Sequence, residues 1–182
     1  GLREITAESG GNVSVTVGDA FSVRAESDGD ISRASAALQG QRLVLGRSGQ
    51  TGALRFGRGA KLSFTVSLPT LDAAEATSGA DMKIAGMQGG ALMLKASSGS
   101  DIVADGSCET LDAEASSGSD IRAFGLSCGT VRAESSSGAD IEVYASRKIV
   151  ARASSGGSIV VRGSPENQNV DRSSGGTVRF ED

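Results

Sequence analysis

The sequence predicts an all-β protein that folds as a parallel β-helix, a solenoid with coils of about 19–20 residues. Two observations carry this prediction. First, a short motif with the pattern Ser-Gly-x-x-apolar recurs at intervals of 18 to 20 residues, and its glycines are Gly79, Gly99, Gly118, Gly138, Gly156 and Gly175. Second, the segments between the motifs alternate apolar with polar residues, and none shows the roughly ten residues of helical periodicity that a helix-containing repeat needs.

The composition limits the size of the side chains in the core and the classes of function that the chain can have. Aromatic residues make up only 3% of the 182 residues and many of the hydrophobic ones are alanine, so the core must be narrow and filled by small aliphatic side chains. The chain has no histidine, which removes the commonest general base and transition-metal ligand. The net charge of −4 and the lack of a basic patch argue against a nucleic-acid partner, and no apolar run approaches the roughly 18 residues of a membrane span. We expect no cofactor and no metal.

Residues 1–70 are expected to form an irregular β region that belongs to the same domain and covers one end of the stack. Apolar residues gather in five short strand-like runs, at residues 13–17, 21–25, 43–45, 54–56 and 62–68. Pro69 ends the last run, because proline cannot donate a hydrogen bond to a sheet. Three segments resemble weaker copies of the motif at similar spacing, and they lie at residues 9–13, 28–31 and 48–49.

Residues 71–182 are expected to form the regular coils of the β-helix. Each unit has one strand-like piece after the motif glycine, such as residues 102–104, and a second before the next glycine, such as residues 111–115. Equivalent residues of successive coils should stack about 4.8 Å apart. We therefore expect one internal column of Ile102, Ile121 and Ile141 and another of Ala113, Ala133 and Ala151. The motif glycine is expected to take positive φ, at a corner where a β-carbon would strain the backbone.

Four aspartates follow the motif glycines at the same offset and should form one column, namely Asp81, Asp101, Asp120 and Asp140. Carboxylates held side by side suit hard cations such as calcium, so a weak cation site is one interpretation. Calcium-binding β-helical repeats have a nonapeptide period and a Gly-Gly-x-Gly-x-Asp pattern, which this chain lacks. The other interpretation is that each Asp or Ser of the motif accepts a hydrogen bond from backbone N–H groups of the turn.

Outward-facing polar residues are also expected to stack into ladders. Serine pairs precede the motif glycines and should form hydroxyl ladders, because no histidine or other base is placed to activate a nucleophile. Charged residues should pair between coils, Asp112 with Arg132 and Arg122 with Glu142, and a longer ladder should contain Lys95, Glu114, Glu134 and Arg152. A solvated face with weak ion pairs is one interpretation of this ladder, and a pair of carboxylates that cleaves polysaccharides is the other.

The two cysteines occupy equivalent positions in neighbouring coils. Cys108 and Cys128 each stand ten residues before the following motif glycine. Stacking would bring their Cα atoms to about 5 Å, within the range of about 4.4–6.8 Å that a disulfide needs. We expect a Cys108–Cys128 disulfide, with a reduced, stacked pair as the alternative, because two thiolates alone make a poor zinc site. A disulfide would imply an oxidising compartment.

The repeated Ser-Gly-[Ser/Ala]-Asp-[Ile/Met] motif, followed by a strand and then by Leu-x-Ala-x-Ala-Ser-Ser-Gly, resembles a bacterial family of unknown function, the putative autotransporter adhesin, head GIN domain. Residues 13–19, 43–45 and 62–68 agree with this pattern, so the resemblance covers nearly the whole chain. It implies a right-handed parallel β-helix and an exported protein of the cell envelope. It brings no catalytic or binding residues, and the two cysteines are not part of its pattern.

These observations predict a non-enzymatic module of the cell envelope or cell surface that binds another protein or a glycan, through a flat polar β-face or the edge of a terminal coil. The C-terminal coil, at residues 178–180, is the edge expected to take an added strand or to mediate self-association. A polysaccharide-active enzyme and a purely structural envelope spacer are the alternatives. Because the chain opens on Gly1 rather than Met, we expect an exported protein whose signal peptide has been removed, in the periplasm, at the outer membrane or on the surface.

Overall fold

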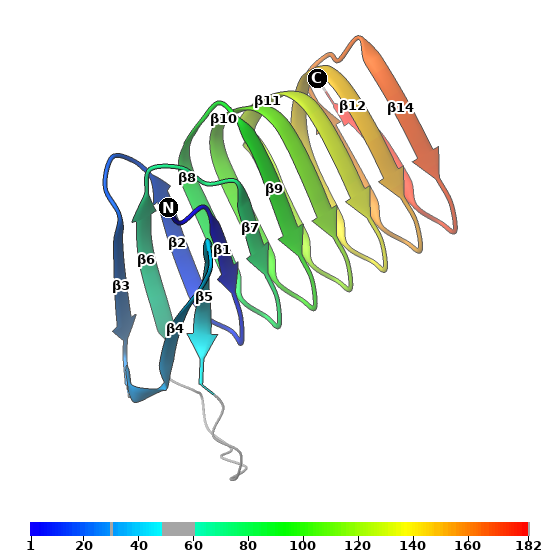
Figure 1. Cartoon of the computed structure of the whole chain (residues 1–182). Helices are drawn as coiled ribbons and strands as arrows, with labels where there is room; N and C mark the ends of the chain where they lie inside the picture. The colour runs from blue at the N-terminus through cyan, green and yellow to red at the C-terminus, as the bar shows by residue number, and fades with distance from the viewer. Residues whose placement is uncertain (30, 49–60, 182) are drawn as a thin grey trace.

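The structure, a computed structural model, describes residues 1–29, 31–48 and 61–181. Figure 1 shows strands wound into a stack of coils, which confirms the predicted all-β solenoid. The strands are β1 (Glu4–Ala7), β2 (Asn12–Val17), β3 (Ser22–Ser27), β4 (Ala34–Gln39), β5 (Arg42–Arg47), β6 (Leu62–Leu68), β7 (Ala73–Ala76), β8 (Asp81–Gln88), β9 (Ala91–Ala96), β10 (Asp101–Ala115), β11 (Asp120–Ser135), β12 (Asp140–Ala153), β13 (Ser158–Arg162), β14 (Asn167–Arg172) and β15 (Thr177–Glu181). A short 3-10 helix, η1 (Ile31–Arg33), joins β3 to β4.

Two parallel sheets form opposite walls of the stack. The wall that follows each Ser-Gly turn, which we name the motif face, contains β2, β8, β13, β15 and the first halves of β10, β11 and β12. The wall that precedes each turn, which we name the ladder face, contains β1, β7, β9, β14 and the second halves of β10, β11 and β12. In Figure 1 the chain descends the near ladder face and rises along the far motif face as it advances toward the C-terminus. This winding is right-handed, the sense that the twist of β-strands favours.

The regular coils are more continuous than the sequence predicts. The two strand-like pieces expected within each unit, one after a motif glycine and one before the next, are joined in β10, β11 and β12, which have 15, 16 and 14 residues. Each strand passes from the motif face to the ladder face at a shift of register, which in the β10–β11 ladder lies between Val103 and Gly106. An extra residue bends a strand without ending it, and an alternating pattern does not show where that residue lies.

The core is the narrow interior between the two walls. The predicted internal columns are present and in register, with Ile102, Ile121 and Ile141 in one and Ala113, Ala133 and Ala151 in the other, all fully buried. The alanine column lets the ladder face approach the opposite wall closely. A chain with 3% aromatic residues can therefore fill its interior without large side chains.

Each corner between a ladder-face strand and the next motif-face strand is a tight turn with two residues at positive φ. The motif glycines adopt this conformation as predicted, with φ from 66° at Gly118 to 78° at Gly175. The serine before each glycine adopts it too, for example Ser117 at φ 58°, which the sequence pattern does not indicate. Two successive left-handed residues characterise a type I′ turn. The turns also bond to one another, since the Gly118 N–H donates to the Ser137 carbonyl of the next coil at 3.2 Å.

The N-terminal coils are not stacked in the order in which they follow one another along the chain. β1 pairs with both β5 and β7, and β2 pairs with both β6 and β8. The first coil of the chain therefore lies inside the stack, between the β5–β6 coil and the β7–β8 coil, instead of over its end. The weaker motif copy at residues 9–13 is a true coil turn, because Ser9 and Gly10 have positive φ and the Gly10 N–H donates to the Ser78 carbonyl at 3.1 Å.

The end of the stack is covered by β3 and β4 instead. β3 is antiparallel to β6 at the outer end of the stack (Figure 1), and β4 is antiparallel to β5. η1 lies between these two covering strands in the chain. Of the weaker motif copy expected at residues 28–31, Asp28 and Gly29 follow β3 and Ile31 begins η1. Asp30, Gly49 and the strand expected at residues 54–56 lie outside the described residues.

Candidate binding site

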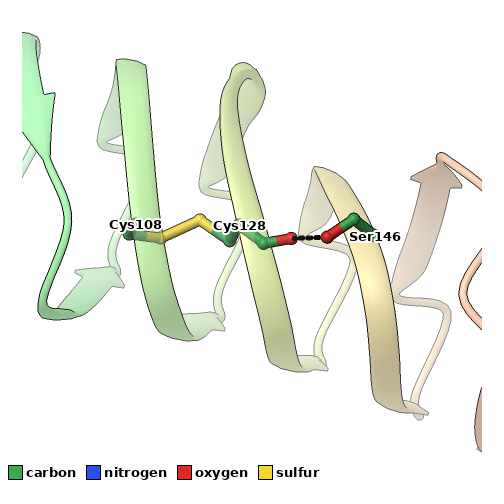
Figure 2. Close-up of a disulfide and its surroundings, with 3 residues drawn as sticks. All are labelled: Cys108, Cys128 and Ser146. Atoms are coloured by element: carbon green, nitrogen blue, oxygen red, sulfur yellow. Dashed lines mark hydrogen bonds between the residues drawn. A yellow bond between two sulfur atoms is a disulfide. The ribbon is translucent and has the colours of Figure 1, made fainter.

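The predicted Cys108–Cys128 disulfide is present. The two cysteines are direct partners in the β10–β11 ladder, with their Cα atoms 4.6 Å apart, and both side chains are buried. Figure 2 shows the bridge between neighbouring coils, and the Ser146 hydroxyl of the following coil donates to the Cys128 carbonyl at 3.2 Å. Both cysteines lie in the middle of their strands, so the bridge ties the coils together where the strands pass between the two walls.

The predicted aspartate column is also in register, on the motif face. Its members are successive partners in the parallel ladders, in the order Asp81, Asp101, Asp120 and Asp140. Arg122 contacts two of them, Asp101 at 3.5 Å and Asp120 at 2.5 Å. Arg122 and Glu142 are partners in the β11–β12 ladder as predicted, but the Arg122 guanidinium turns to the aspartates instead.

The hydroxyl that caps the turn belongs to the serine before the aspartate. Ser100 and Ser119 are fully buried. The Ser119 hydroxyl accepts a hydrogen bond from the Ser116 N–H at 3.1 Å and donates to the Ala96 carbonyl of the preceding coil at 2.8 Å. The turn-capping interpretation thus describes these two serines, whereas Asp101 and Asp120 serve as partners of Arg122.

Burial and the neighbouring carboxylates raise the pKa of Asp120. Partial burial raises the pKa of this carboxyl, and the charges of Asp101 and Asp140 raise it further. Arg122 and the backbone N–H of Asp140 act in the opposite direction and are outweighed, although the Arg122 contact is short. Within residues 1–29, 31–48 and 61–181, no group of three or more His, Cys, Asp or Glu side chains is arranged to hold a metal ion.

The ladder face carries the predicted charge ladder. Its four predicted members are successive partners in neighbouring coils, Lys95, Glu114, Glu134 and Arg152. Glu75 and Asp171 extend this ladder by one coil at either end. Arg152 donates to Glu134 at 2.8 Å, and Lys95 lies 3.9 Å from Glu114. Arg132, in the adjacent column, donates to Glu134 at 2.6 Å and lies 3.6 Å from Asp112, which confirms the predicted Asp112–Arg132 pair.

Two arginines keep Glu134 ionised. The hydrogen bond from Arg152 has the largest influence, and together with Arg132 it lowers the pKa of the Glu134 carboxyl against the opposing effect of partial burial. In return, the hydrogen bond with Glu134 raises the pKa of Arg132. A general acid in glycoside cleavage needs a raised pKa. The site therefore has the chemistry of a fixed anion held between cations.

A groove of about 470 Å³ runs along the charge ladder on the side of the turns. The charge ladder from Lys95 to Asp171 lines one side, and a hydroxyl ladder formed by Ser116, Ser136, Ser154 and Ser173 lines the other. The small residues between them, Ala96, Ala115, Ser135 and Ala153, complete the lining. Because successive coils repeat at about 4.8 Å, the groove presents a periodic row of hydrogen-bond donors and acceptors.

The motif face carries a second cluster, of aromatic and cationic side chains. The guanidinium carbon of Arg162 lies 3.9 Å from the centroid of the Phe124 ring, and Tyr144 is the partner of Arg162 in the β12–β13 ladder. Sequence reasoning missed this cluster, although all three residues stand six positions after a motif glycine. This shared offset is the signal that could have found it.

Comparison with known families agrees with the repeat motifs. The family described as "Putative auto-transporter adhesin, head GIN domain" matches residues 1–165. The chain belongs to this family. The head GIN resemblance of the motifs is thereby confirmed, and the family is adhesin-like with an unknown ligand. Among the described residues, no helix is long and apolar enough to cross a membrane.

Solved bacterial structures share the fold of this head GIN domain. It is similar to a putative adhesin from Bacteroides fragilis NCTC 9343, with a TM-score of 0.76 and 19% identity over 99% of this chain and 92% of that chain. It is also similar to a putative adhesin from Parabacteroides distasonis ATCC 8503, with a TM-score of 0.54 and 17% identity over 99% and 92% of the two chains.

A further similar structure is a putative lipid binding protein from Parabacteroides distasonis ATCC 8503, with a TM-score of 0.55 and 14% identity over 100% of this chain and 93% of that chain. At these identities the likeness shows the fold alone. No curated protein matches the chain.

Proposed function

We propose that this domain is a non-enzymatic binding module of the cell envelope or cell surface, and that it holds an extended glycan along the ladder-face groove. The observation that carries the proposal is the alignment of the charge ladder with the hydroxyl ladder over successive coils. Membership of an adhesin-like family supports a binding role. The Cys108–Cys128 disulfide supports an oxidising location, such as the periplasm or the cell exterior.

The chemistry of the groove favours a glycan over a protein. Stable protein interfaces centre on aromatic and large apolar side chains, and the described residues that line the groove include none of these. A glycan instead carries hydroxyl groups along its whole length, and each can both donate and accept. Serine hydroxyls, ionised carboxylates and the Arg152 guanidinium are suitable partners for such groups. Because the hydroxyl ladder has one serine in each coil, a repeating polymer meets an equivalent hydroxyl at each step along the groove.

The groups that line the groove are held before a ligand arrives. Glu134 is fixed between Arg132 and Arg152, at 2.6 Å and 2.8 Å. The backbone that carries the hydroxyl ladder is bonded from coil to coil, as in the bond of 3.1 Å from the Ser116 N–H to the Ala96 carbonyl. Binding to fixed groups costs less conformational entropy than binding to mobile ones.

A glycan-cleaving enzyme is the main alternative, and the electrostatics favour binding without cleavage. Glu114 and Glu134 are direct partners in neighbouring strands, and a retaining glycosidase also places two carboxyls about 5 Å apart. Such an enzyme needs one carboxyl with a raised pKa, whereas Arg152 and Arg132 lower the pKa of Glu134. Lys95 lies beside Glu114.

The proposal is tested by measuring binding and cleavage on a panel of neutral, acidic and amino-sugar oligosaccharides. We expect at least one class to bind without release of new reducing ends. Glu134→Gln, which keeps the shape of the side chain and removes its charge, should weaken that binding at least tenfold. Glu142→Gln on the motif face is the matched control and should leave the affinity unchanged. Failure to bind any glycan of the panel, or cleavage of one, contradicts the proposal.

A further inference from the structure

The two ends of the stack are finished differently. At the C-terminal end, β14 carries polar side chains at two positions that face the interior, because Gln168 aligns with Ile149 and Arg172 with Ala153 in the β12–β14 ladder. One large apolar side chain is exposed at this end, Phe180 of β15, the partner of the buried Val161, with an exposed fraction of 39%. The Arg172 guanidinium donates to the Val178 carbonyl at 3.0 Å, which places a polar group beside the last strand. A polar terminal unit of this kind is how repeat proteins usually end a stack.

The other end, formed by β3 and β4, leaves apolar side chains in contact with solvent. Val23 aligns with the buried Val66 and Leu38 aligns with the buried Leu43, so both side chains lie on the interior side of their sheets. Their exposed fractions are nevertheless 38% for Val23 and 68% for Leu38. Two further large apolar side chains are exposed in the same part of the chain, Phe21 at 57% and Ile31 at 52%. A group of exposed apolar side chains at one end of a domain indicates an interaction surface.

The strands at this end also have unpaired backbone edges. Within the described part of the chain, β3 pairs only with β6 and β4 pairs only with β5. The Asp28 N–H donates to the Lys61 carbonyl at 3.3 Å, so the backbone of Asp28 points toward β6. Alternate residues of an antiparallel strand point their N–H and C=O groups to opposite sides. By that alternation, the N–H and C=O groups of Val23, Ala25 and Ser27 point away from β6. Such an edge is a template for another strand.

The charges of β3 are complementary to those of a second β3. Arg24 and Glu26 flank Ala25, and neither forms an ion pair with another described residue. In an antiparallel pairing of two β3 strands about a twofold axis at Ala25, Arg24 of each copy lies opposite Glu26 of the other. Opposite charges placed directly across antiparallel strands stabilise the pairing, and like charges destabilise it.

We propose that two copies of this chain associate end to end through β3 and β4, about a twofold axis perpendicular to the two walls. Rotation about this axis reverses strand direction and keeps each wall in its own plane. β3 therefore pairs antiparallel with β3 of the second copy, β4 pairs with β4 in the same way, and both sheets continue across the interface. The pairing covers Val23 and Leu38. It uses the end of the stack opposite to the C-terminal edge that the sequence predicts for self-association.

Analytical ultracentrifugation of the whole chain, from about 1 µM to about 1 mM, tests this proposal. The wild-type chain is expected to show a concentration-dependent monomer–dimer equilibrium. Arg24→Glu and Glu26→Arg each place like charges opposite one another twice, so each variant should weaken the dimer about tenfold or more. An equimolar mixture of these two variants again has opposite charges across the interface and should form a heterodimer with an affinity close to that of the wild type.

Two proline variants separate the two ends of the stack. Ala25→Pro removes an unpaired N–H from β3. Val178→Pro removes an unpaired N–H from β15, because the Thr177 N–H donates to the Gly157 carbonyl at 2.9 Å and the next N–H, that of Val178, points away from β13. Ala25→Pro should abolish the dimer and Val178→Pro should leave it unchanged, with thermal unfolding used to confirm that each variant is folded. If Ala25→Pro does not fold, the charge reversals and their mixture decide. A wild-type chain that stays monomeric, or a dimer lost in Val178→Pro and unaffected by both charge reversals, overturns the proposal.

Discussion

Cys108 and Cys128 occupy the same position in two neighbouring coils, and their Cα atoms lie 4.6 Å apart across the β10–β11 ladder. The bridge forms because the coils are laid in register, and it spans a sequence separation of 20 residues, which is one turn of the solenoid. The disulfide can therefore form only when these two coils are stacked in this register.

The first prediction concerns this bridge. The paired variant Cys108→Ser and Cys128→Ser should lower the free energy of unfolding by about 3 kcal/mol, because the cross-link no longer restricts the unfolded chain. Urea denaturation with and without reductant measures this effect. Reductant should destabilise the wild type and leave the paired variant unchanged. Equal stability of the wild type in both conditions would show that the bridge contributes nothing.

The second prediction concerns the turns. Gly118 has φ 66°, and a β-carbon placed on it would meet no atom within 4 Å, so the cost of Gly118→Ala comes from the backbone alone. We expect this variant to lose about 1 kcal/mol of stability. Gly118→Asn should lose less, because asparagine tolerates the left-handed conformation. The order of the two urea midpoints checks the argument, and a more stable alanine variant would contradict it.

Much of the regular stack follows from the sequence because a solenoid converts sequence offset into position. The period places Ile102 on Ile121 and Cys108 on Cys128, since residues at equal offsets from the motif glycines meet across the coils. The same rule locates the charge ladder that lines the groove. The groove itself is not visible in the sequence, because it depends on how far the serine column stands from the charged column.

The order of the N-terminal coils does not follow from the sequence. β1 carries the same alternation as any other strand, and nothing local to it specifies that it pairs with both β5 and β7. Positive φ at Ser117 could not be read either, since serine rarely adopts it and the bonds between successive turns that accompany it become visible only after stacking. Strand direction at the covered end is a third case, because an alternating pattern is the same for parallel and antiparallel pairing.

The third prediction is the pH dependence of Glu134. Its folded-state pKa is lowered from the ordinary value of 4.5, mainly by the hydrogen bond from Arg152. An acid with a lowered pKa contributes stability above its unfolded-state pKa and loses this contribution as the pH falls through the folded-state pKa. Relative to Glu134→Gln, the wild type should therefore lose stability as the pH falls below about 4.5. If the free energies of unfolding of the two proteins differ by the same amount from neutral to acid pH, the lowered pKa of Glu134 is contradicted.

The fourth prediction concerns Asp120, whose pKa is raised in the folded chain, whereas that of Glu134 is lowered. Burial and the neighbouring carboxylates raise the pKa of Asp120 from its ordinary value of 3.8. An acid with a raised folded-state pKa binds its proton more tightly in the folded chain. Relative to Asp120→Asn, the wild type should therefore gain stability as the pH falls through the raised pKa toward 3.8. Urea denaturation of both proteins over the acid range measures the difference, and a relative loss for the wild type would show that Arg122 dominates instead.

The most direct test of the glycan-binding account is to map where a bound oligosaccharide touches the domain, by NMR chemical-shift changes during titration with a ligand identified from the panel. The account predicts that the largest changes fall on the amides of the ladder-face groove, at Ser116, Glu134, Ser136, Arg152 and Ser154, and that the motif face is unaffected. Changes confined to the motif-face cluster of Phe124, Tyr144 and Arg162, or to either end of the stack, would contradict it.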